Sequence, residues 1–403
     1  MNQSPKRIHK ILTDAVISGL EEIFFKNRKS DQVVGELLKS NKKWGKRDRS
    51  FIAETIYEVV RWWRKVAFIA DVKKPEKEDL WKIVGTWFVL NDYELPKWEE
   101  FAELNIQVIK ERAVKAEETR AIRESIPDWM DEMGEAYFGY DWDYELKALN
   151  SPADVYLRTN TLKINRTDLQ RALEKREIAT EQIAATDDAL QLIDRKNLKT
   201  NEVFRKGFFE IQDAGSQLIA EFVNPTKGSF VIDACAGAGG KSLHLAALME
   251  NTGKIRSMDI DAKKLSELEY RAKRNGVKNI STVPIERETT ENYAGTADYL
   301  LMDVPCSGLG VLRRNPDAKW KITADFVEKI QATQAKILRD YVKMLKPNGI
   351  LVYATCSIFP QENEEQVKKF LGDNPDFQLI EEKHLTPHKN GFDGFYMAKL
   401  KRG

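Results

Sequence analysis

Two of the three cysteines in this 403-residue sequence come directly after apolar segments, and each is followed by a serine. Cys306 ends the stretch YLLMDVPC, and Cys356 ends GILVYATC. If these segments are neighbouring strands of a parallel sheet, both thiols lie at its carboxyl edge, where such sheets bind ligands. A lone cysteine is more often a small buried packing residue. Two cysteines at the ligand edge instead favour a chemical role, because a thiolate attacks carbon readily once its pKa falls toward neutrality.

A glycine-rich turn, VIDACAGAGGKS at 231–242, separates another apolar strand from a helix. A P-loop would need glycine at position 235, which is cysteine, and the G-x-G-x-x-G dinucleotide pattern is also missing. Asp259 closes the next strand, KIRSMD, where a carboxylate can accept both hydroxyls of a ribose. These features favour S-adenosylmethionine, a cation without a pyrophosphate, although a plain tight turn between strand and helix is the alternative. Cys235, inside the turn, is expected to pack there.

A nucleophilic cysteine beside a methyl-donor pocket predicts pyrimidine 5-methylation. Carbon 5 of cytosine is too electron-poor to attack a methyl sulfonium unaided, and addition of a thiolate at carbon 6 makes carbon 5 nucleophilic. Amino-group methylases would carry a D-P-P-Y or N-P-P-F type motif where this chain has DVPC, so carbon methylation is preferred.

The surrounding elements predict three domains. The first ~130 residues show helical periodicity, with Ser50 able to cap the helix that follows it. A strand-like segment at 156–164 and a helical one after it predict a small α+β connector. From about 221, strands alternate with helices, which predicts a mostly parallel sheet covered on both faces. We therefore expect domains at 1–140, 141–220 and 221–403.

Composition and charge narrow the functional classes. Three cysteines without paired spacing fit a reducing cytoplasm, and the four scattered histidines offer no metal site, so no metal is expected. No apolar run reaches the ~18 residues of a membrane helix. Residues 1–70 hold 15 Lys and Arg against 8 Asp and Glu, whereas 71–150 hold 11 against 20. Tryptophans among the basic residues at 39–66 suit phosphate contacts and base stacking, and a solvated helical face is the alternative.

Long motifs in the second half resemble the RsmB/Nop/Sun family of RNA cytosine-5 methyltransferases. They are IQDAGSQL (211–218), DACAGAGGKS (233–242), LMDVPCSGLGVLRRNPDAKW (301–320), LVYATCSIFPQENEEQV (351–367) and DGFYMAKLKR (393–402). The resemblance implies a Rossmann-like, class I S-adenosylmethionine methyltransferase domain. More weakly, the first ~130 residues resemble the NusB-like helical domain of bacterial RsmB-type members.

The resemblance also implies roles for individual residues. Cys356, in the T-C motif, corresponds to the nucleophile, and Cys306, in the P-C motif, to a residue that helps release the product. Asp303 and Lys241 are expected near the target base. The implied S-adenosylmethionine contacts are Cys235, Ala236, Gly237, Ala238, Gly239, Gly240, Lys241, Asp259 and Asp303, with Glu286 as the acid nearest to the expected adenine contact; the implied RNA phosphate contacts are Arg313, Arg314 and Lys319. For those three basic residues a structural ion-pair cluster is the alternative.

The sequence departs from the family at two places: Gly237 and Ala238 replace the usual alanine and proline of the loop, and Glu286 stands near the place of an aspartate. The resulting hypothesis is a cytoplasmic, monomeric enzyme that methylates carbon 5 of a cytosine in 16S ribosomal RNA. Transfer RNA is the alternative substrate. A non-catalytic RNA-binding factor of ribosome assembly is the alternative from another class.

Overall fold

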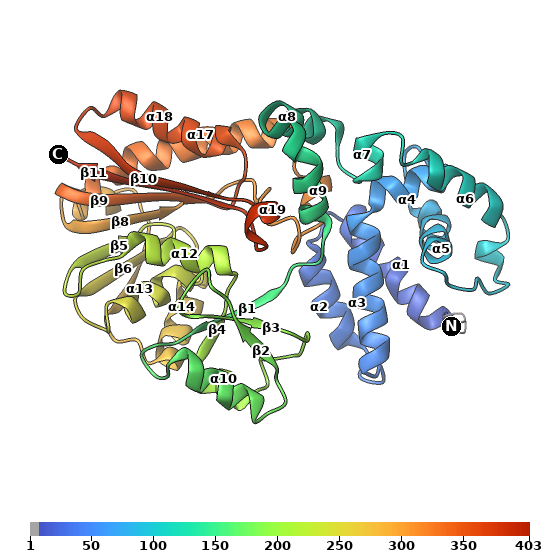
Figure 1. Cartoon of the computed structure of the whole chain (residues 1–403), viewed down its shortest axis with the longest axis horizontal. Helices are drawn as coiled ribbons and strands as arrows, with labels where there is room; N and C mark the ends of the chain where they lie inside the picture. The colour runs from blue at the N-terminus through green and yellow to red at the C-terminus, as the bar shows by residue number, and fades with distance from the viewer. Residues whose placement is uncertain (1–7) are drawn as a thin grey trace. The chain divides into compact units, whose positions relative to one another are not determined.

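The computed structural model describes residues 8–403, which form two compact units (Figure 1). The first unit comprises the described residues up to 151 together with 312–324, and the second comprises 152–311 and 325–403. The expected domain boundary at 140 therefore falls inside the first unit, which also includes the helix α9 (Trp142–Asn150).

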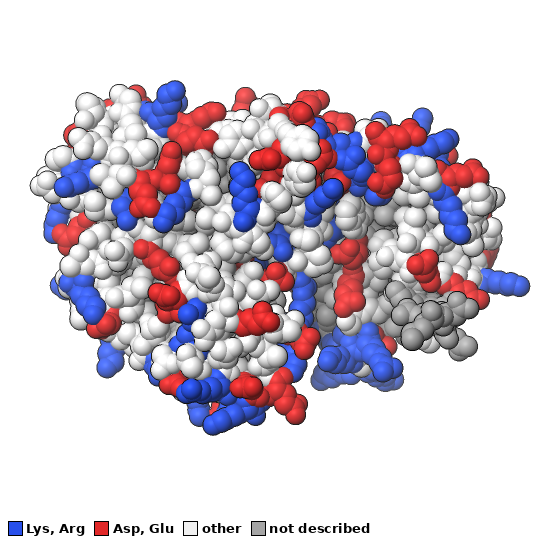
Figure 2. All heavy atoms as spheres, viewed as in Figure 1, with Lys and Arg blue, Asp and Glu red and all other residues white. Residues whose placement is uncertain are grey.

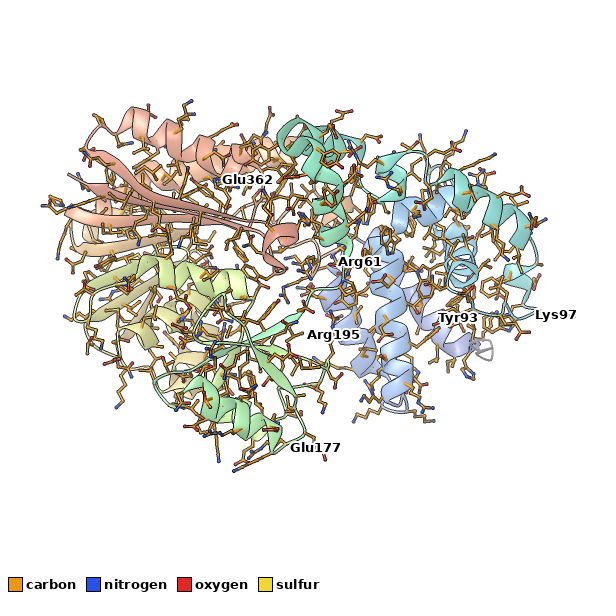
Figure 3. All side chains as sticks on the ribbon, in the orientation of Figure 1. Arg61, Tyr93, Lys97, Glu177, Arg195 and Glu362 are labelled. Carbon is orange, nitrogen blue, oxygen red and sulfur yellow. The ribbon has the colours of Figure 1, made fainter. Side chains whose placement is uncertain are left out.

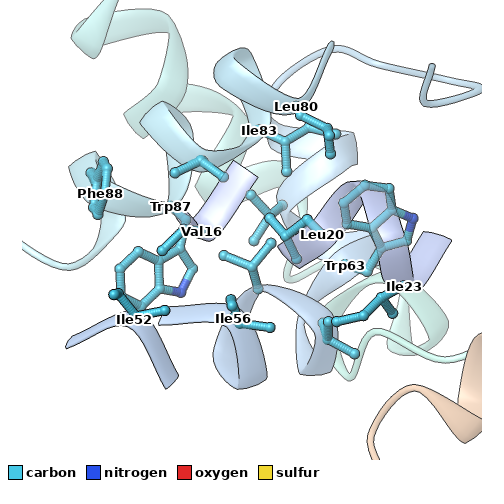
Figure 4. Packing of buried hydrophobic residues seen from close by; sticks show 14 of the residues in the cluster. Val16, Leu20, Ile23, Ile52, Ile56, Trp63, Leu80, Ile83, Trp87 and Phe88 are labelled. Atoms are coloured by element: carbon cyan, nitrogen blue, oxygen red, sulfur yellow. The ribbon is translucent and has the colours of Figure 1, made fainter. Parts of the chain in front are cut away.

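The first unit is helical throughout its described part. Its elements are α1 (Lys10–Phe24), α2 (Ser30–Ser40), α3 (Lys46–Arg61), α4 (Trp63–Ile69), η1 (Lys77–Asp79), α5 (Leu80–Leu90), η2 (Glu99–Phe101), α6 (Ile106–Lys115), α7 (Arg120–Arg123), α8 (Asp128–Phe138), η3 (Gly139–Asp141), α9 and α16 (Ala318–Lys321). Apolar residues three or four apart on α1, α3 and α5 interlock in one core, as Figure 4 shows for Leu20, Ile56 and Ile83. This core fixes the helices that carry the basic N-terminal segment.

The helix α3 begins five residues earlier than the sequence predicted. Gly45 is its N-cap, and the Gly45 N–H donates to Asp48 Oδ2 at 2.8 Å. Ser50 therefore lies within the helix, where its hydroxyl donates to Glu54 Oε1 at 2.5 Å instead of capping the first turn.

Residues 312–324 belong to the helical unit although the strands before and after them belong to the second unit. Ser30 Oγ donates to Asp317 Oδ1 at 2.6 Å, and the Trp320 indole donates to the Val60 carbonyl at 2.6 Å. These contacts make the segment a structural part of the helical unit.

The second unit begins with a small antiparallel sheet of order β2-β3-β1-β4. Its elements are β1 (Val155–Thr159), α10 (Arg166–Glu174), β2 (Thr180–Gln182), β3 (Ala189–Leu192), α11 (Glu202–Arg205) and β4 (Phe209–Ile211). Leu157, Leu173 and Phe209 are fully buried in its own core, so the predicted α+β connector is confirmed as an element of the fold.

A seven-stranded sheet of order β10-β11-β9-β8-β5-β6-β7 forms the rest of the unit. Its strands are β5 (Phe230–Asp233), β6 (Lys254–Asp259), β7 (Ile280–Pro284), β8 (Ala297–Asp303), β9 (Leu345–Thr355), β10 (Phe377–Leu385) and β11 (Phe395–Arg402). Strands β5 to β9 pair in parallel, whereas β11 runs antiparallel to both β9 and β10. The mostly parallel sheet predicted from the sequence is confirmed.

Helices cover both faces of this sheet (Figure 1). They are α12 (Ala214–Val223), α13 (Gly240–Leu248), α14 (Ala262–Asn275), α15 (Thr289–Asn292), α17 (Ala324–Tyr341), α18 (Glu364–Asp373) and α19 (Pro387–Asn390), with 3₁₀ turns η4 (Val342–Met344) and η5 (Pro360–Glu362). The helices α17 and α18 pack on one face, through residues such as Leu338 and Phe370. The helices α12 and α13 pack on the other, through Ile219 and Leu245. Within residues 8–403, no helix is both long and apolar enough to span a membrane.

Candidate active site

The glycine-rich loop joins the carboxyl end of β5 to the start of α13 and is tied to the neighbouring strand. The Ala236 N–H donates to the Met258 carbonyl at 2.9 Å, and the Gly237 N–H donates to Asp259 Oδ2 at 2.8 Å. Gly239 has a φ of +84°, and a Cβ atom there would lie 2.3 Å from Leu268 Cγ. The loop can therefore keep this shape only with glycine at 239.

A cavity of about 240 Å³ opens beside this loop at the carboxyl edge of the sheet. Its polar side is formed by Asp259 and Asp303, which close β6 and β8. Its apolar walls include Ile260, Ile285 and Tyr341. The full lining is Ala234, Cys235, Gly237, Asp259, Ile260, Lys264, Ile285, Asp303, Val304, Pro305, Ile337 and Tyr341. Carboxylates beside an apolar slot fit a nucleoside, whose ribose is polar and whose base has flat apolar faces.

Burial controls the protonation of the groups around the cavity. It raises the pKa of the Cys235 thiol well above its ordinary value, so this cysteine stays a neutral packing group. Burial also raises the pKa of Tyr341 to about 12 and that of Asp233 to about 6. Asp233 accepts a hydrogen bond from Ser242 Oγ at 2.6 Å beneath the loop.

Lys241 and Asp303 form an ion pair at the sheet edge, with the ammonium in direct contact with the carboxylate. Burial opposes the charge of Lys241, but the charge of Asp303 and its hydrogen bond outweigh burial, with smaller contributions from Asp233 and Cys356, and the pKa of Lys241 is raised. Lys241 is therefore a fixed hydrogen-bond donor whose charge also acts on Cys356.

Cys306 and Cys356 meet because β8 and β9 pair in parallel, with Asp303 opposite Ala354. Both cysteines are free thiols, their sulfurs are 2.9 Å apart, and the Cys356 N–H donates to Cys306 Sγ at 3.2 Å. The hydrogen bond to Cys356 and burial raise the pKa of Cys306 well above its ordinary value. Cys306 therefore stays protonated near neutral pH.

The structure places Glu286, the expected adenine contact, outside the lining of the cavity. Glu286 is exposed in the turn after β7 and does not line the cavity, whereas its neighbour Ile285 does. The cavity wall at this point is apolar, and the adenine contact of Glu286 stays a prediction.

The prediction that Lys319 contacts an RNA phosphate is wrong. Its side chain is buried in the helical unit, where Nζ donates to the carbonyls of Arg61 and Ser125 and to Asn150 Oδ1, at 2.7, 2.9 and 2.9 Å. Burial lowers the pKa of Lys319 well below its ordinary value. Arg313 is also buried, at 7% exposure, which does not fit a phosphate contact, while Arg314 is half-buried and its RNA contact stays a prediction.

The structure adds residues that the sequence did not single out. Ile260 directly follows β6, whereas Ile337 and Tyr341 lie one turn apart on α17, and they meet only in the folded cavity. Glu362 and Asn363 bind residues next to the two cysteines. Both lie in the PQENE part of the motif at 351–367, where the sequence predicted no role for them.

This fold and cavity define a class I methyltransferase, and comparison with known proteins agrees. The sequence profile described as 16S rRNA methyltransferase RsmB/F matches residues 220–401, and that of the RsmF/B-like ferredoxin-like domain matches 126–199. Ribosomal RNA small subunit methyltransferase B of Shewanella oneidensis is 32% identical over 302 residues, covering 70% of this chain and 68% of that protein. The probable methyltransferase B of Bacillus subtilis is also 32% identical, over 303 residues, covering 70% and 67%.

A solved structure is similar over nearly the whole chain. The crystal structure of PH0851 has a TM-score of 0.84 and 22% identity, covering 99% of this chain and 100% of that one, which bears on the fold alone. On the sequence matches, this chain belongs to the RsmB/F family of 16S rRNA methyltransferases. It is an S-adenosylmethionine-dependent RNA methyltransferase.

Proposed function

We propose that this enzyme transfers a methyl group to carbon 5 of a cytosine in 16S ribosomal RNA through a covalent adduct between Cys356 and carbon 6. The observation that carries the proposal is the pair of free thiols, 2.9 Å apart, at the edge of the sheet that also forms the nucleoside-sized cavity. A single buried cysteine would not require this chemistry, whereas two adjacent thiols can divide attack and release between them.

Cys356 is the proposed nucleophile. Its Sγ bonds to carbon 6, and the electron pair of the carbon 5–carbon 6 double bond becomes available at carbon 5. S-adenosylmethionine, when bound, supplies a methyl group on a positively charged sulfur. Loss of the carbon 5 proton then lets the bond between sulfur and carbon 6 break, which restores the ring.

Cys306 is the proposed partner in release. It holds its proton and lies within hydrogen-bond distance of Cys356 Sγ. The Cys306 S–H can therefore donate to the Cys356 thiolate as that thiolate leaves carbon 6, which disfavours renewed attack.

Lys241 and Asp303 are proposed to hold the base. The ammonium of Lys241 can donate to a ring acceptor such as N3, and the Asp303 carboxylate can accept from the 4-amino group.

The cavity residues fit S-adenosylmethionine. Asp259 is placed to accept from the ribose, and of the predicted loop contacts Cys235 and Gly237 line the cavity, whereas Ala236, Ala238, Gly239, Gly240 and Lys241 lie outside its lining. Ile260, Ile285 and Tyr341 can enclose the adenine, the contact once expected from Glu286. The base to be methylated has to be unstacked to reach this edge, which favours single-stranded or loop RNA.

Ribosomal RNA is favoured as substrate by the family and by the names of the relatives. An exposed basic patch at the α2–α3 turn supports RNA binding by the helical unit, and Figure 2 shows its Lys and Arg side chains gathered there. The patch comprises Lys39, Lys42, Lys43, Lys46 and Arg47. Transfer RNA is the alternative substrate. The proposal includes action as a cytoplasmic monomer.

Methyl transfer tests the proposal. Labelled S-adenosylmethionine is supplied with unmodified 16S ribosomal RNA or unmodified transfer RNA, and 5-methylcytidine is identified in the digests. We expect label in ribosomal RNA, lost in Cys356→Ala. Label in transfer RNA alone would overturn the substrate, and methylated cytosine made equally by Cys356→Ala would overturn the mechanism. Absence of both transfer and cofactor binding would favour an assembly factor.

A further inference from the structure

Two adjacent residues, Glu362 and Asn363, hold the two cysteine loops from behind. Glu362 ends η5, Asn363 follows it directly, and both are buried, at 0% and 1% exposure. Figure 3 labels Glu362, which lies between β9 and α18. The two side chains contact different loops.

Glu362 holds the loop that carries Cys306. Its carboxylate accepts from the Ser307 backbone N–H at 2.8 Å and is also contacted by the Ser307 hydroxyl. Gln334 Nε2, on α17, donates to Glu362 Oε2 at 3.0 Å and to the Pro305 carbonyl at 3.1 Å. Ser307, after Cys306, is thus bound directly to the Glu362 carboxylate. Pro305, before Cys306, is bound to it through the side-chain amide of Gln334.

Asn363 does the same for the loop that carries Cys356. Its Nδ2 donates to the Ser357 carbonyl at 3.1 Å, and its Oδ1 accepts from Thr355 Oγ1 at 2.5 Å. Thr355 and Ser357 are the residues on either side of Cys356. The serine after each cysteine is therefore part of this network: Ser307 through its backbone and hydroxyl, and Ser357 through its carbonyl.

The carboxylate of Glu362 also acts on Cys306 through its charge. After the hydrogen bond to Cys356 and burial, the charges of Cys356 and Glu362 are further causes that raise the pKa of Cys306. Tyr353 faces the same group of residues from β9 and donates its hydroxyl to the Glu362 carbonyl at 2.6 Å. The three donors to the Glu362 carboxylate are all neutral, so its negative charge is not cancelled by a cation among them.

We propose that Glu362 and Asn363 are positioning residues of the two-thiol site: they fix the distance between Cys306 and Cys356 by holding the residues on either side of each cysteine, and the Glu362 carboxylate disfavours a negative charge on Cys306. This inference rests on the proposed function for its catalytic consequence. Its consequence for the thiols themselves does not depend on any RNA.

The experiment therefore has two readouts on the full-length protein. The first is the rate at which Cys306 and Cys356 react with iodoacetamide as a function of pH, measured separately for each cysteine by peptide mass spectrometry. The second is the rate of methyl transfer to 16S ribosomal RNA. The variants are Glu362→Gln, Ser307→Ala and Asn363→Ala, and the matched control is Glu365→Gln, which removes the same charge from an exposed position on α18. S-adenosylmethionine binding reports that each variant is folded.

For Glu362→Gln we expect Cys306 to react severalfold faster near neutral pH, with its profile moved to lower pH, because the negative charge beside it is gone. Ser307→Ala keeps that charge, so its Cys306 profile should follow the wild type. All three variants should lose methyl transfer, by roughly 10- to 100-fold, because small displacements of reacting groups are costly. Glu365→Gln should match the wild type in both readouts.

The proposal is overturned if Glu362→Gln binds S-adenosylmethionine and leaves both the Cys306 profile and methyl transfer within twofold of the control. If Glu362→Gln does not fold, Ser307→Ala and Asn363→Ala test the positioning role. An unchanged rate of methyl transfer in both of these variants would overturn it. If the wild type methylates no RNA, the proposed function fails, and the thiol profiles still test whether the Glu362 carboxylate acts on Cys306.

Discussion

Gly239 provides a stringent test of the loop geometry. A side chain at this position meets two separate obstacles: the left-handed backbone, with φ of +84°, and the side chain of Leu268, whose Cγ and Cδ1 would lie 2.3 and 2.8 Å from the new Cβ. Gly237, two residues earlier, is the matched control. It also has a positive φ, +52°, but a Cβ there meets nothing within 4 Å.

The magnitudes follow from these two obstacles. Left-handed backbone costs an ordinary residue roughly 1–2 kcal/mol, and overpacking a buried contact costs roughly 1–3 kcal/mol. We therefore expect Gly239→Ala to destabilise the second unit by about 2–5 kcal/mol and Gly237→Ala by only about 1–2 kcal/mol. Leu268→Ala should relieve the clash, so that the double variant Gly239→Ala/Leu268→Ala loses about 1–3 kcal/mol less than the two single changes together.

The assay has to follow the second unit alone. All nine tryptophans lie in the helical unit, so their fluorescence reports the wrong part of the chain. Amide hydrogen exchange of the β5–α13 segment, measured by mass spectrometry, gives its opening free energy directly. Equal losses for Gly237→Ala and Gly239→Ala, or strict additivity with Leu268→Ala, would refute the argument.

Three further predictions concern the cofactor, the pH response and the thiols. Asp259→Ala should weaken S-adenosylmethionine binding roughly 10- to 100-fold by calorimetry, because it removes the cavity carboxylate that we propose accepts from the ribose; unchanged affinity would contradict the assignment. Burial lowers the pKa of His244 to about 4, so between about pH 4 and its unfolded value near 6.5 the unfolded state binds more protons, and stability falls as pH falls. Denaturation should show wild type losing about 2 kcal/mol relative to His244→Leu between pH 7 and 5, and parallel pH curves would contradict this. Diamide, a two-electron thiol oxidant, should form a disulfide between Cys306 and Cys356 with loss of two hydrogens, because the sulfurs are 2.9 Å apart. Activity should be lost with the crosslink, and dithiothreitol should restore both the thiols and the activity. Mass spectra without this crosslink would be inconsistent with the geometry.

Much of the catalytic edge could be predicted because strand ends determine it. Apolar runs that end in Asp259, Asp303 and the two cysteines place those residues at one edge whenever the strands are parallel and adjacent. The pairing of β8 with β9 confirms that adjacency.

The misplaced residues share a physical reason. Sequence shows that Lys319 is charged, but only the fold shows that three acceptors, from α3, the turn after α7 and α9, surround its ammonium. Glu286 and Ser50 were one residue and one turn away from the features expected of them, because local polarity does not determine which residue faces a cavity or where a helix begins. Glu362 was overlooked because its donors lie 28 and 55 positions away in the chain.

Trapping of the covalent adduct tests the central claim most directly. RNA containing 5-fluorocytosine at the target position cannot lose a proton from carbon 5, so the adduct should persist once the methyl group has been transferred. We predict a protein–RNA species that requires S-adenosylmethionine, is attached at Cys356 in peptide mass spectra and is absent from Cys356→Ala. An adduct attached at Cys306 instead, or methylation of natural RNA without any adduct on the fluorinated one, would contradict the proposed mechanism.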